Sequence, residues 1–224
     1  MDNKVLIFPL TCAALAMMMT LAPPLGSKPI VAVKITRDIP SVTVNHGGHP
    51  LTVTRNQDTN HRLDPGFAKT SRRCPPFCIQ PMIAAPGVMT IGEVELVQFM
   101  ESDLKNGSGL LIDARTRDWH KRGTIPGSIN IPYAEIAPYL GTSESILLKT
   151  MARFGVDVEV DGSWDFTNAK KLVMWCNGPW CGQSPAAIRG LLEVGYPADK
   201  ILYYRGGMQL WKLFGLTVAQ PNKS

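Results

Sequence analysis

Residues 171–185 read Lys171-Leu-Val-Met-Trp-Cys176-Asn-Gly-Pro-Trp-Cys181-Gly-Gln-Ser184-Pro185 and predict a strand, a thiol-bearing loop and a helix in direct succession. The short apolar run before Cys176 is typical of a buried strand, and Asn-Gly-Pro ends it with turn residues. A serine followed by a proline at 184–185 is a strong helix start. Cys176 is therefore expected beside a helix N-terminus, where unpaired N–H groups favour the thiolate and can hold an anion on its sulfur.

Further strands and helices alternate along the C-terminal part of the chain. Apolar runs predict strands at 109–113, 172–175 and 200–204, and helices are expected at 94–104, 143–154, 186–192 and 208–214. This alternation predicts an α/β fold, an open parallel sheet flanked by helices on both faces. Ligands bind such sheets beyond the carboxyl ends of the strands. One of these ends carries Asp113 with Arg115, a second carries Cys176, and a third carries Arg205. These side chains are therefore expected around one edge of the sheet.

The segment 29–86 is expected to form a small β-hairpin followed by a Pro- and Cys-rich extension. Alternating apolar residues at 41–45 and 51–55 flank a Gly-Gly pair and predict the hairpin. The run Cys74-Pro-Pro-Phe-Cys78 is too rich in proline for a helix. Three states stay open for Cys74 and Cys78: a structural disulfide or free thiols, a redox-active pair, or a metal site.

Residues 1–25 have the form of a secretory signal peptide, because Lys4 precedes an apolar run from Val5 to Ala22. That run approaches the length of a bilayer span, so an uncleaved N-terminal anchor is the alternative. Both alternatives predict an exported protein, either periplasmic or tethered to the outer face of the cytoplasmic membrane. Disulfides are permitted there.

The composition is that of an ordinary globular protein, with 45% hydrophobic and 18% charged residues in a chain of 224. The formal net charge of +5 and the pI near 9.0 could favour a small anionic substrate or an acidic partner. No run of Lys and Arg with interleaved aromatic residues is present, so a nucleic-acid partner is not expected. Membrane contact is expected only through an anchor at 1–25.

Three signatures resemble those of the rhodanese-like domain family and follow one another in the same order. The first is Leu111-Ile-Asp113-Ala-Arg115 followed by Gly123-Thr-Ile-Pro-Gly-Ser-Ile-Asn-Ile-Pro132. The second is Cys176 after an apolar strand, which matches the family's nucleophile. The third is Gly195-Tyr196 followed by Tyr203-Tyr-Arg-Gly-Gly-Met-Gln-Leu-Trp211.

The resemblance covers residues 88–218 and implies a sulfurtransferase that needs no cofactor or metal. Cys176 would carry sulfane sulfur as a persulfide, taken from thiosulfate or another persulfide and passed to a thiol or cyanide. The implied partners are therefore a small sulfur-containing anion or a thiol acceptor, with a redox protein as a further option. The residues expected to bind the substrate are Asn177, Gly178, Pro179, Trp180, Gly182, Gln183, Arg115 and Arg205.

The active-site loop departs from the family's usual pattern and is similar to a minority form, Cys-x-Gly-Pro-x-Cys. The loop is longer than usual, and Gln183 stands where an arginine often ends it. Gly182 occupies the position at which the related phosphatases need arginine, so phosphatase activity is not expected. The altered loop leaves the sulfur donor open and allows for thiosulfate being a poor one.

Cys181 gives the loop a second thiol. It could attack a Cys176 persulfide and leave a disulfide, or cycle with Cys176 as a dithiol pair. The alternative is that Cys181 packs under the loop as a small hydrophobe. Two functions therefore stay open beside sulfur transfer: a thiol–disulfide oxidoreductase that uses Cys176 and Cys181, and a non-catalytic rhodanese-like binding module.

Overall fold

The computed structural model describes residue 1 and residues 32–221. The predicted signal peptide or anchor at 1–25 therefore lies outside the described residues, apart from Met1. Residues 32–221 fall within one compact unit. Across this described part of the chain, the helices are too short or too polar to cross a membrane.

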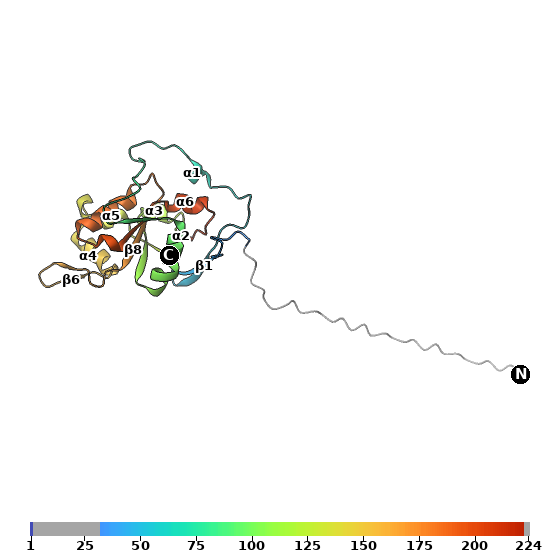
Figure 1. The fold of residues 1–224 in the computed structure, drawn as a ribbon, viewed down its shortest axis with the longest axis horizontal. Coiled ribbons are helices and arrows are strands. Elements are labelled where there is room, and N and C mark those ends of the chain that lie inside the picture. The colour runs from blue at the N-terminus through green and yellow to red at the C-terminus, as the bar shows by residue number, and fades with distance from the viewer. Residues whose placement is uncertain (2–31, 222–224) are drawn as a thin grey trace. The chain divides into compact units, whose positions relative to one another are not determined.

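A five-stranded parallel sheet forms the centre of this unit, as the alternation of strands and helices predicts. Its strands, in spatial order, are β3 (Met89–Ile91), β9 (Ile201–Tyr204), β8 (Lys171–Trp175), β4 (Gly109–Asp113) and β5 (Ser128–Asn130) (Figure 1). The last residues of the three middle strands lie in register, since Trp175 pairs with both Asp113 and Tyr204. The loops that follow these strands therefore meet at one edge of the sheet.

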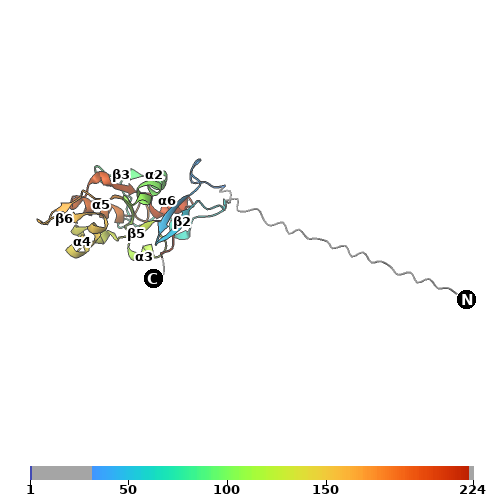
Figure 2. The same cartoon turned by 90° about the horizontal axis from the view of Figure 1, so that it is seen from below.

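Strand β8 is buried on both faces, as its apolar sequence predicts. Leu172 and Met174 belong to a core cluster that includes residues of α4 (Glu144–Arg153) and α5 (Gln183–Glu193). Val173 and Trp175 belong to a second cluster with α2 (Glu93–Phe99) and α6 (Gly207–Leu213). Side chains of a strand alternate between its faces, so each layer of helices covers one face (Figure 2).

The predicted hairpin is confirmed. It consists of the antiparallel strands β1 (Val42–His46) and β2 (His49–Val53). Val42, Val44 and Val53 are buried in the same cluster as α2 and α6. The hairpin thus adds to the core of the sheet domain on that face.

The extension after the hairpin passes along α6 toward the loop that follows β8. Its one helix, α1 (Pro65–Ala68), lies beside α6, where Asp64 forms an ion pair with Lys212. The Nε2 atom of Gln209 also donates to the carbonyl of Phe67 (3.2 Å). In Figure 1 the extension is the long teal segment that carries the label α1.

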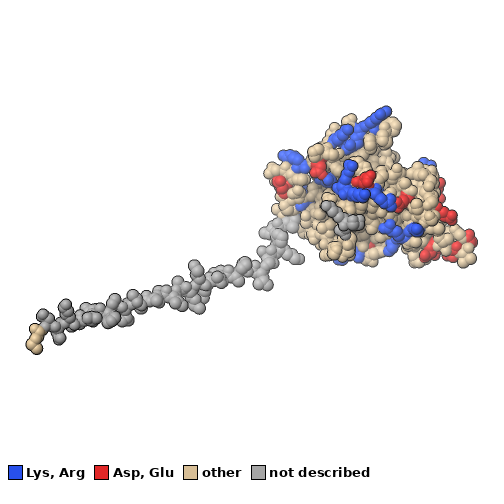
Figure 3. Space-filling view, turned by 180° about the vertical axis from the view of Figure 1, so that it is seen from behind, with Lys and Arg blue, Asp and Glu red and all other residues tan. Residues whose placement is uncertain are grey.

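Short elements complete the fold. They are α3 (Arg117–His120), β6 (Asp157–Val158), β7 (Trp164–Asp165), the π-helical turn η1 (Met100–Leu104) and the 3-10 turns η2 (Tyr133–Glu135), η3 (Pro138–Leu140) and η4 (Ala198–Lys200). On the face shown in Figure 3, Lys and Arg side chains lie in separate groups, and Asp and Glu side chains gather toward one end.

Candidate active site

Cys176 directly follows β8, as predicted, and its side chain is only 2% exposed. The start of α6 holds the loop backbone: Met208 N–H donates to the Cys176 carbonyl (3.0 Å), and Gln209 N–H donates to the Asn177 carbonyl (3.0 Å). This close approach requires glycine at 207, where φ is +54° and a Cβ atom would lie 2.3 Å from the Cys176 carbonyl oxygen. Strand β9 and α6 therefore fix the position of the thiol.

Hydrogen-bond donors converge on the Cys176 sulfur. The Ser184 hydroxyl lies 3.0 Å from Sγ, and backbone N–H groups of Gly178 and Ser184 also point to it. Burial by itself raises the pKa of Cys176, but these donors and the Cys181 thiol lower the pKa to about 7. One acceptor opposes them, because the Cys181 carbonyl lies 3.2 Å away and accepts from the protonated thiol. The donors are more numerous, so the site favours a thiolate.

The helix start differs from the sequence prediction in one respect. Helix α5 begins at Gln183 with Gly182 as its N-cap, and the structure gives this cap no side-chain hydrogen bond. Ser184 lies inside the first turn, and its hydroxyl bonds to the Cys176 sulfur instead of capping the helix. The prediction placed a helix after the loop but began it at Ser184 and Pro185, and it missed the role of Ser184 in the thiol site.

Cys181 lies next to Cys176 and is also buried and not part of a disulfide. Its hydrogen bond to the Cys176 sulfur, its burial and the negative charge on that sulfur all raise the pKa of Cys181 well above its usual value. Its thiol also lies 3.7 Å from Oε1 of Gln183. The pair therefore consists of one easily ionised thiol and one that keeps its proton.

Arg115 does not lie where a substrate-binding residue is expected. Its side chain is 1% exposed and forms a two-pronged ion pair with Asp113 (2.8 and 2.7 Å). The guanidinium also donates to the Asn177 side chain (3.3 Å) and the Gly123 carbonyl (2.7 Å), and it lies over the Trp175 ring, 4.6 Å from its centroid. Because these bonds leave the guanidinium engaged and buried, Arg115 supports the loop, and this placement does not favour the substrate-binding role expected of it.

Asp113 is the centre of this buried network. Besides Arg115, it accepts hydrogen bonds from the Thr124 hydroxyl (3.0 Å) and contacts Nδ1 of His120 (2.9 Å). Burial disfavours the charged carboxylate, yet the hydrogen bonds from Arg115 and His120 and their charges lower the pKa of Asp113 below its usual value. A charged carboxylate therefore fixes the arginine that holds Asn177.

Arg205, which directly follows β9, bonds to the backbone of the extension. Its Nη2 atom donates to the Gln80 carbonyl (2.9 Å), and its Nε atom is 3.2 Å from the Pro81 carbonyl. Gln80 N–H in turn donates to the carbonyl of Pro179 in the active-site loop (2.7 Å). The guanidinium thus bonds to the extension and ties it to the active edge, and substrate binding by Arg205 stays a prediction.

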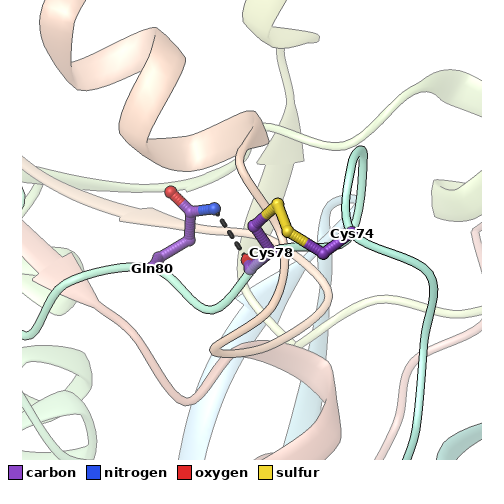
Figure 4. The surroundings of a disulfide bond; sticks show 3 residues. All are labelled: Cys74, Cys78 and Gln80. Carbon is purple, nitrogen blue, oxygen red and sulfur yellow. Dashed lines mark hydrogen bonds between the residues drawn. A yellow bond between two sulfur atoms is a disulfide. The ribbon is translucent and has the colours of Figure 1, made fainter.

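Cys74 and Cys78 form a disulfide, one of the states that the sequence leaves open, with their Cα atoms 4.6 Å apart. Figure 4 shows it two residues before Gln80, whose Nε2 atom donates to the Cys78 carbonyl (2.9 Å). The structure thus places this pair next to the active-site loop although about 100 residues separate them in sequence. Among residues 32–221, no cluster of three His, Cys, Asp or Glu side chains is arranged to hold a metal.

A cleft of about 350 Å³ opens beside the active-site loop, and Cys181 is one of its lining residues. It brings together predicted residues of the loop with aromatic residues that the sequence reasoning missed. The lining residues are Pro76, Phe77, Trp119, Tyr133, Asn177, Trp180, Cys181, Gly182 and Gln183. Phe77 lies between the two disulfide cysteines, and this was the one sequence signal that could have drawn attention to it.

All predicted residues from 176 to 183 lie in this one loop or at the start of α5. Gly178 and Pro179 act through their backbones, which bond to Cys181 N–H (2.9 Å) and Gln80 N–H (2.7 Å). Trp180 is half-buried and donates its indole N–H to Gln209. The loop is therefore held by α6 below it and by the extension at its side.

The family described as the rhodanese-like domain matches residues 96–213. The HTH-type transcriptional regulator Rv0324 of Mycobacterium tuberculosis is 29% identical over 112 residues, which are 50% of this chain and 38% of that protein. The chain thus spans well under two thirds of this relative's length.

Solved structures with a similar fold include two named as sulfurtransferases. The human single-domain sulfurtransferase TSTD1 is 22% identical with a TM-score of 0.37, over 55% of this chain and 95% of that one. The thiosulfate sulfurtransferase of Pseudomonas aeruginosa is 19% identical with a TM-score of 0.41, over 60% of this chain and 21% of that one. The family match itself covers more than half of the residues, so the chain belongs to the rhodanese-like domain family.

Proposed function

We propose that this chain is a sulfurtransferase that carries sulfane sulfur as a persulfide on Cys176 and passes it to a thiol or a similar acceptor. The observation that carries the proposal is the thiol at the end of β8, whose pKa is lowered to about 7 by converging donors inside a rhodanese-like domain. A pKa near 7 leaves a large fraction of thiolate at neutral pH, and the thiolate is the nucleophile.

The transfer consists of two displacements at sulfur. The Cys176 thiolate attacks the sulfane sulfur of the donor, a new S–S bond forms, and the donor's S–S bond breaks with its electron pair on the leaving group. The acceptor thiolate then attacks the outer sulfur and restores the Cys176 thiolate. The Ser184 hydroxyl and the N–H of Gly178, which stabilise the thiolate, are placed to stabilise the anionic persulfide as well.

Cys181 offers a second way to discharge the persulfide. If its thiolate attacks the Cys176 sulfur, hydrosulfide leaves and a Cys176–Cys181 disulfide remains, which an external reductant must open. Burial of Cys181, which helps to raise the pKa of its thiol, keeps the attacking thiolate scarce and makes this step slow. Transfer to an external acceptor is therefore the main route in this proposal.

The apolar N-terminal run further supports an exported location, either periplasmic or tethered to the outer face of the cytoplasmic membrane. The partners that fit are a small sulfur-containing molecule, a thiol acceptor and, if the disulfide forms, a redox protein that reduces it. The intact mass of the protein isolated from the exported fraction tests cleavage near residue 25, and an uncleaved chain in the cytoplasm would refute export.

Sulfur uptake tests the chemistry. The reduced protein is incubated with thiosulfate or with glutathione persulfide, desalted, and its intact mass is measured. The wild type and Cys181→Ser should each gain one sulfur atom, and Cys176→Ser should gain none. If Cys176 gains no sulfur from either donor, the proposal fails, and a non-catalytic binding module becomes the better account.

A thiol–disulfide oxidoreductase is the second candidate, favoured by two free thiols in one loop, where Cys176 Sγ lies 3.2 Å from the Cys181 carbonyl. Differential alkylation across a redox titration would distinguish it from sulfur transfer. A Cys176–Cys181 disulfide that forms and is reduced reversibly, without any sulfur uptake, would support the oxidoreductase. A pair that never oxidises would exclude it.

A further inference from the structure

The extension forms one wall of the cleft beside the thiols and is fixed there at several points. Gln80 N–H bonds to the Pro179 carbonyl (2.7 Å), and Arg205 bonds to the carbonyls of Gln80 (2.9 Å) and Pro81 (3.2 Å). The disulfide between Cys74 and Cys78 closes the loop that contains the wall residues. The wall is therefore tied to the active-site loop itself.

Phe77 and Trp180 face each other across the two segments. Their ring centroids are 5.6 Å apart with an interplanar angle of 76°, an edge-to-face contact. Phe77 remains 44% exposed although it is held in place, so part of its ring is free to contact a bound molecule. Arg72 lies over the Trp180 ring, 3.9 Å from its centroid, and braces the tryptophan.

The described lining of the cleft lacks the basic side chains that would bind an inorganic dianion such as thiosulfate. None of its lining residues is a Lys, Arg, Asp or Glu in the part of the chain that the structure describes. Three arginines lie close to the cleft without lining it: Arg72 stacks on Trp180, Arg115 pairs with Asp113, and Arg205 bonds to the Gln80 carbonyl. Binding thiosulfate here would desolvate two negative charges in a cleft that has no basic side chain among its described lining residues, which is unfavourable. The aromatic walls instead match an apolar group of ligand size.

We propose that this cleft binds the sulfur donor and that Phe77 and Trp180 select donors with an aromatic or other apolar substituent next to the sulfane sulfur. This rests on the proposed function. Asn177 lines the cleft and directly follows Cys176 in the chain, so a substituent held between the aromatic walls lies next to the loop that carries the thiol. With an aryl thiosulfonate, Cys176 thiolate takes the outer sulfur, the S–S bond of the donor breaks, and the aryl sulfinate leaves with the electron pair.

A matched pair of donors tests this inference. Benzenethiosulfonate and thiosulfate transfer the same sulfur atom, but the first carries a phenyl ring and one charge less. With cyanide as acceptor and thiocyanate as the measured product, kcat/KM should be at least about 10-fold higher for benzenethiosulfonate. Phe77→Ala should lower kcat/KM for benzenethiosulfonate about 10-fold. The same variant should change kcat/KM for thiosulfate by less than about twofold. Phe77→Leu should lie between, because it keeps apolar bulk.

Ile79→Ala is the matched control, because Ile79 lies in the same extension but is 82% exposed and outside the cleft. Its kcat/KM for both donors should stay within about twofold of the wild type. The inference would be overturned if the wild type had equal kcat/KM values for the two donors. It would also be overturned if Phe77→Ala and Phe77→Leu lowered kcat/KM equally for both donors. Neither result would refute the proposed function. Failure to take sulfur from either donor would instead refute the proposed function, and the inference with it.

Discussion

Removing the Ser184 hydroxyl should make the Cys176 thiol less acidic. Ser184→Ala deletes the donor that lies 3.0 Å from the sulfur. A hydrogen bond to a charged group contributes about 1.5–3 kcal/mol. One pKa unit corresponds to about 1.4 kcal/mol, so this loss corresponds to about 1–2 units. The backbone donors and the Cys181 thiol remain. We therefore expect the lower figure, a pKa that rises from about 7 by about one unit.

The pH dependence of alkylation measures this shift. Only the thiolate reacts with iodoacetamide, so the rate at Cys176 should rise with pH through the pKa and level off above it. Peptide mass spectrometry separates Cys176 from Cys181, whose raised pKa keeps it unreactive over the same range. At about pH 6, Ser184→Ala should react about 10-fold more slowly than the wild type, and at high pH equally fast.

The control for Ser184→Ala is Ser163→Ala, because the Ser163 hydroxyl bonds to Asp161 in the turn between β6 and β7. The midpoint of its alkylation rate against pH should equal that of the wild type. If Ser184→Ala folds normally and its midpoint stays near 7, the hydroxyl does not stabilise the thiolate. If its rate falls equally at every pH, the variant has changed access to the sulfur and not its pKa. Either result would refute the reasoning.

Three further variants test the parts that hold the loop. Gly207→Ala should lower the free energy of unfolding by about 1–3 kcal/mol in urea, because its Cβ would meet the Cys176 carbonyl at a φ of +54°. Arg115→Met should lower the free energy of unfolding by about 3–5 kcal/mol, because Asp113 would stay charged and buried without its ion-pair partner. Adding Asp113→Asn should restore part of this loss. Cys181→Ser should keep sulfur uptake but release no hydrosulfide, measured with methylene blue; hydrosulfide release equal to the wild type would contradict the proposed role of Cys181.

The thiol site could be predicted because its signals are local. An apolar run, turn residues and a Ser-Pro helix start follow one another within 15 residues, and their order alone places Cys176 beyond a strand and before a helix. The hairpin could be predicted for the same reason, since alternating Val residues flank a Gly-Gly turn. The parallel sheet follows from the alternation of such segments.

The roles of the polar side chains could not be predicted in the same way. The sequence places Arg115 and Arg205 at the correct edge of the sheet, but it does not show which oxygen atoms they will meet. Arg115 finds Asp113 two residues away and becomes buried, whereas Arg205 finds the carbonyl of Gln80 in a distant segment. A guanidinium with five donors is satisfied by whichever acceptors the fold brings near it.

The aromatic cleft depends on contacts between segments that are far apart in sequence. Phe77 meets Trp180 because Gln80 bonds to Pro179, and no local pattern records that contact. The close pair Cys74 and Cys78 indicates a constrained loop, but its position becomes clear only once the extension is seen beside the active-site loop. This explains why the thiols were predicted and the wall that faces them was not.

The central claim is that Cys176 carries the transferred sulfur, and intact-mass analysis after incubation with a sulfane-sulfur donor tests it most directly. The reduced wild type and Cys181→Ser should each gain the mass of one sulfur atom, and a reducing thiol should remove it. Cys176→Ser should stay at its own mass. The account would be contradicted if Cys176→Ser gained as much sulfur as the wild type. It would also be contradicted if none of the three proteins gained sulfur from thiosulfate, glutathione persulfide or benzenethiosulfonate.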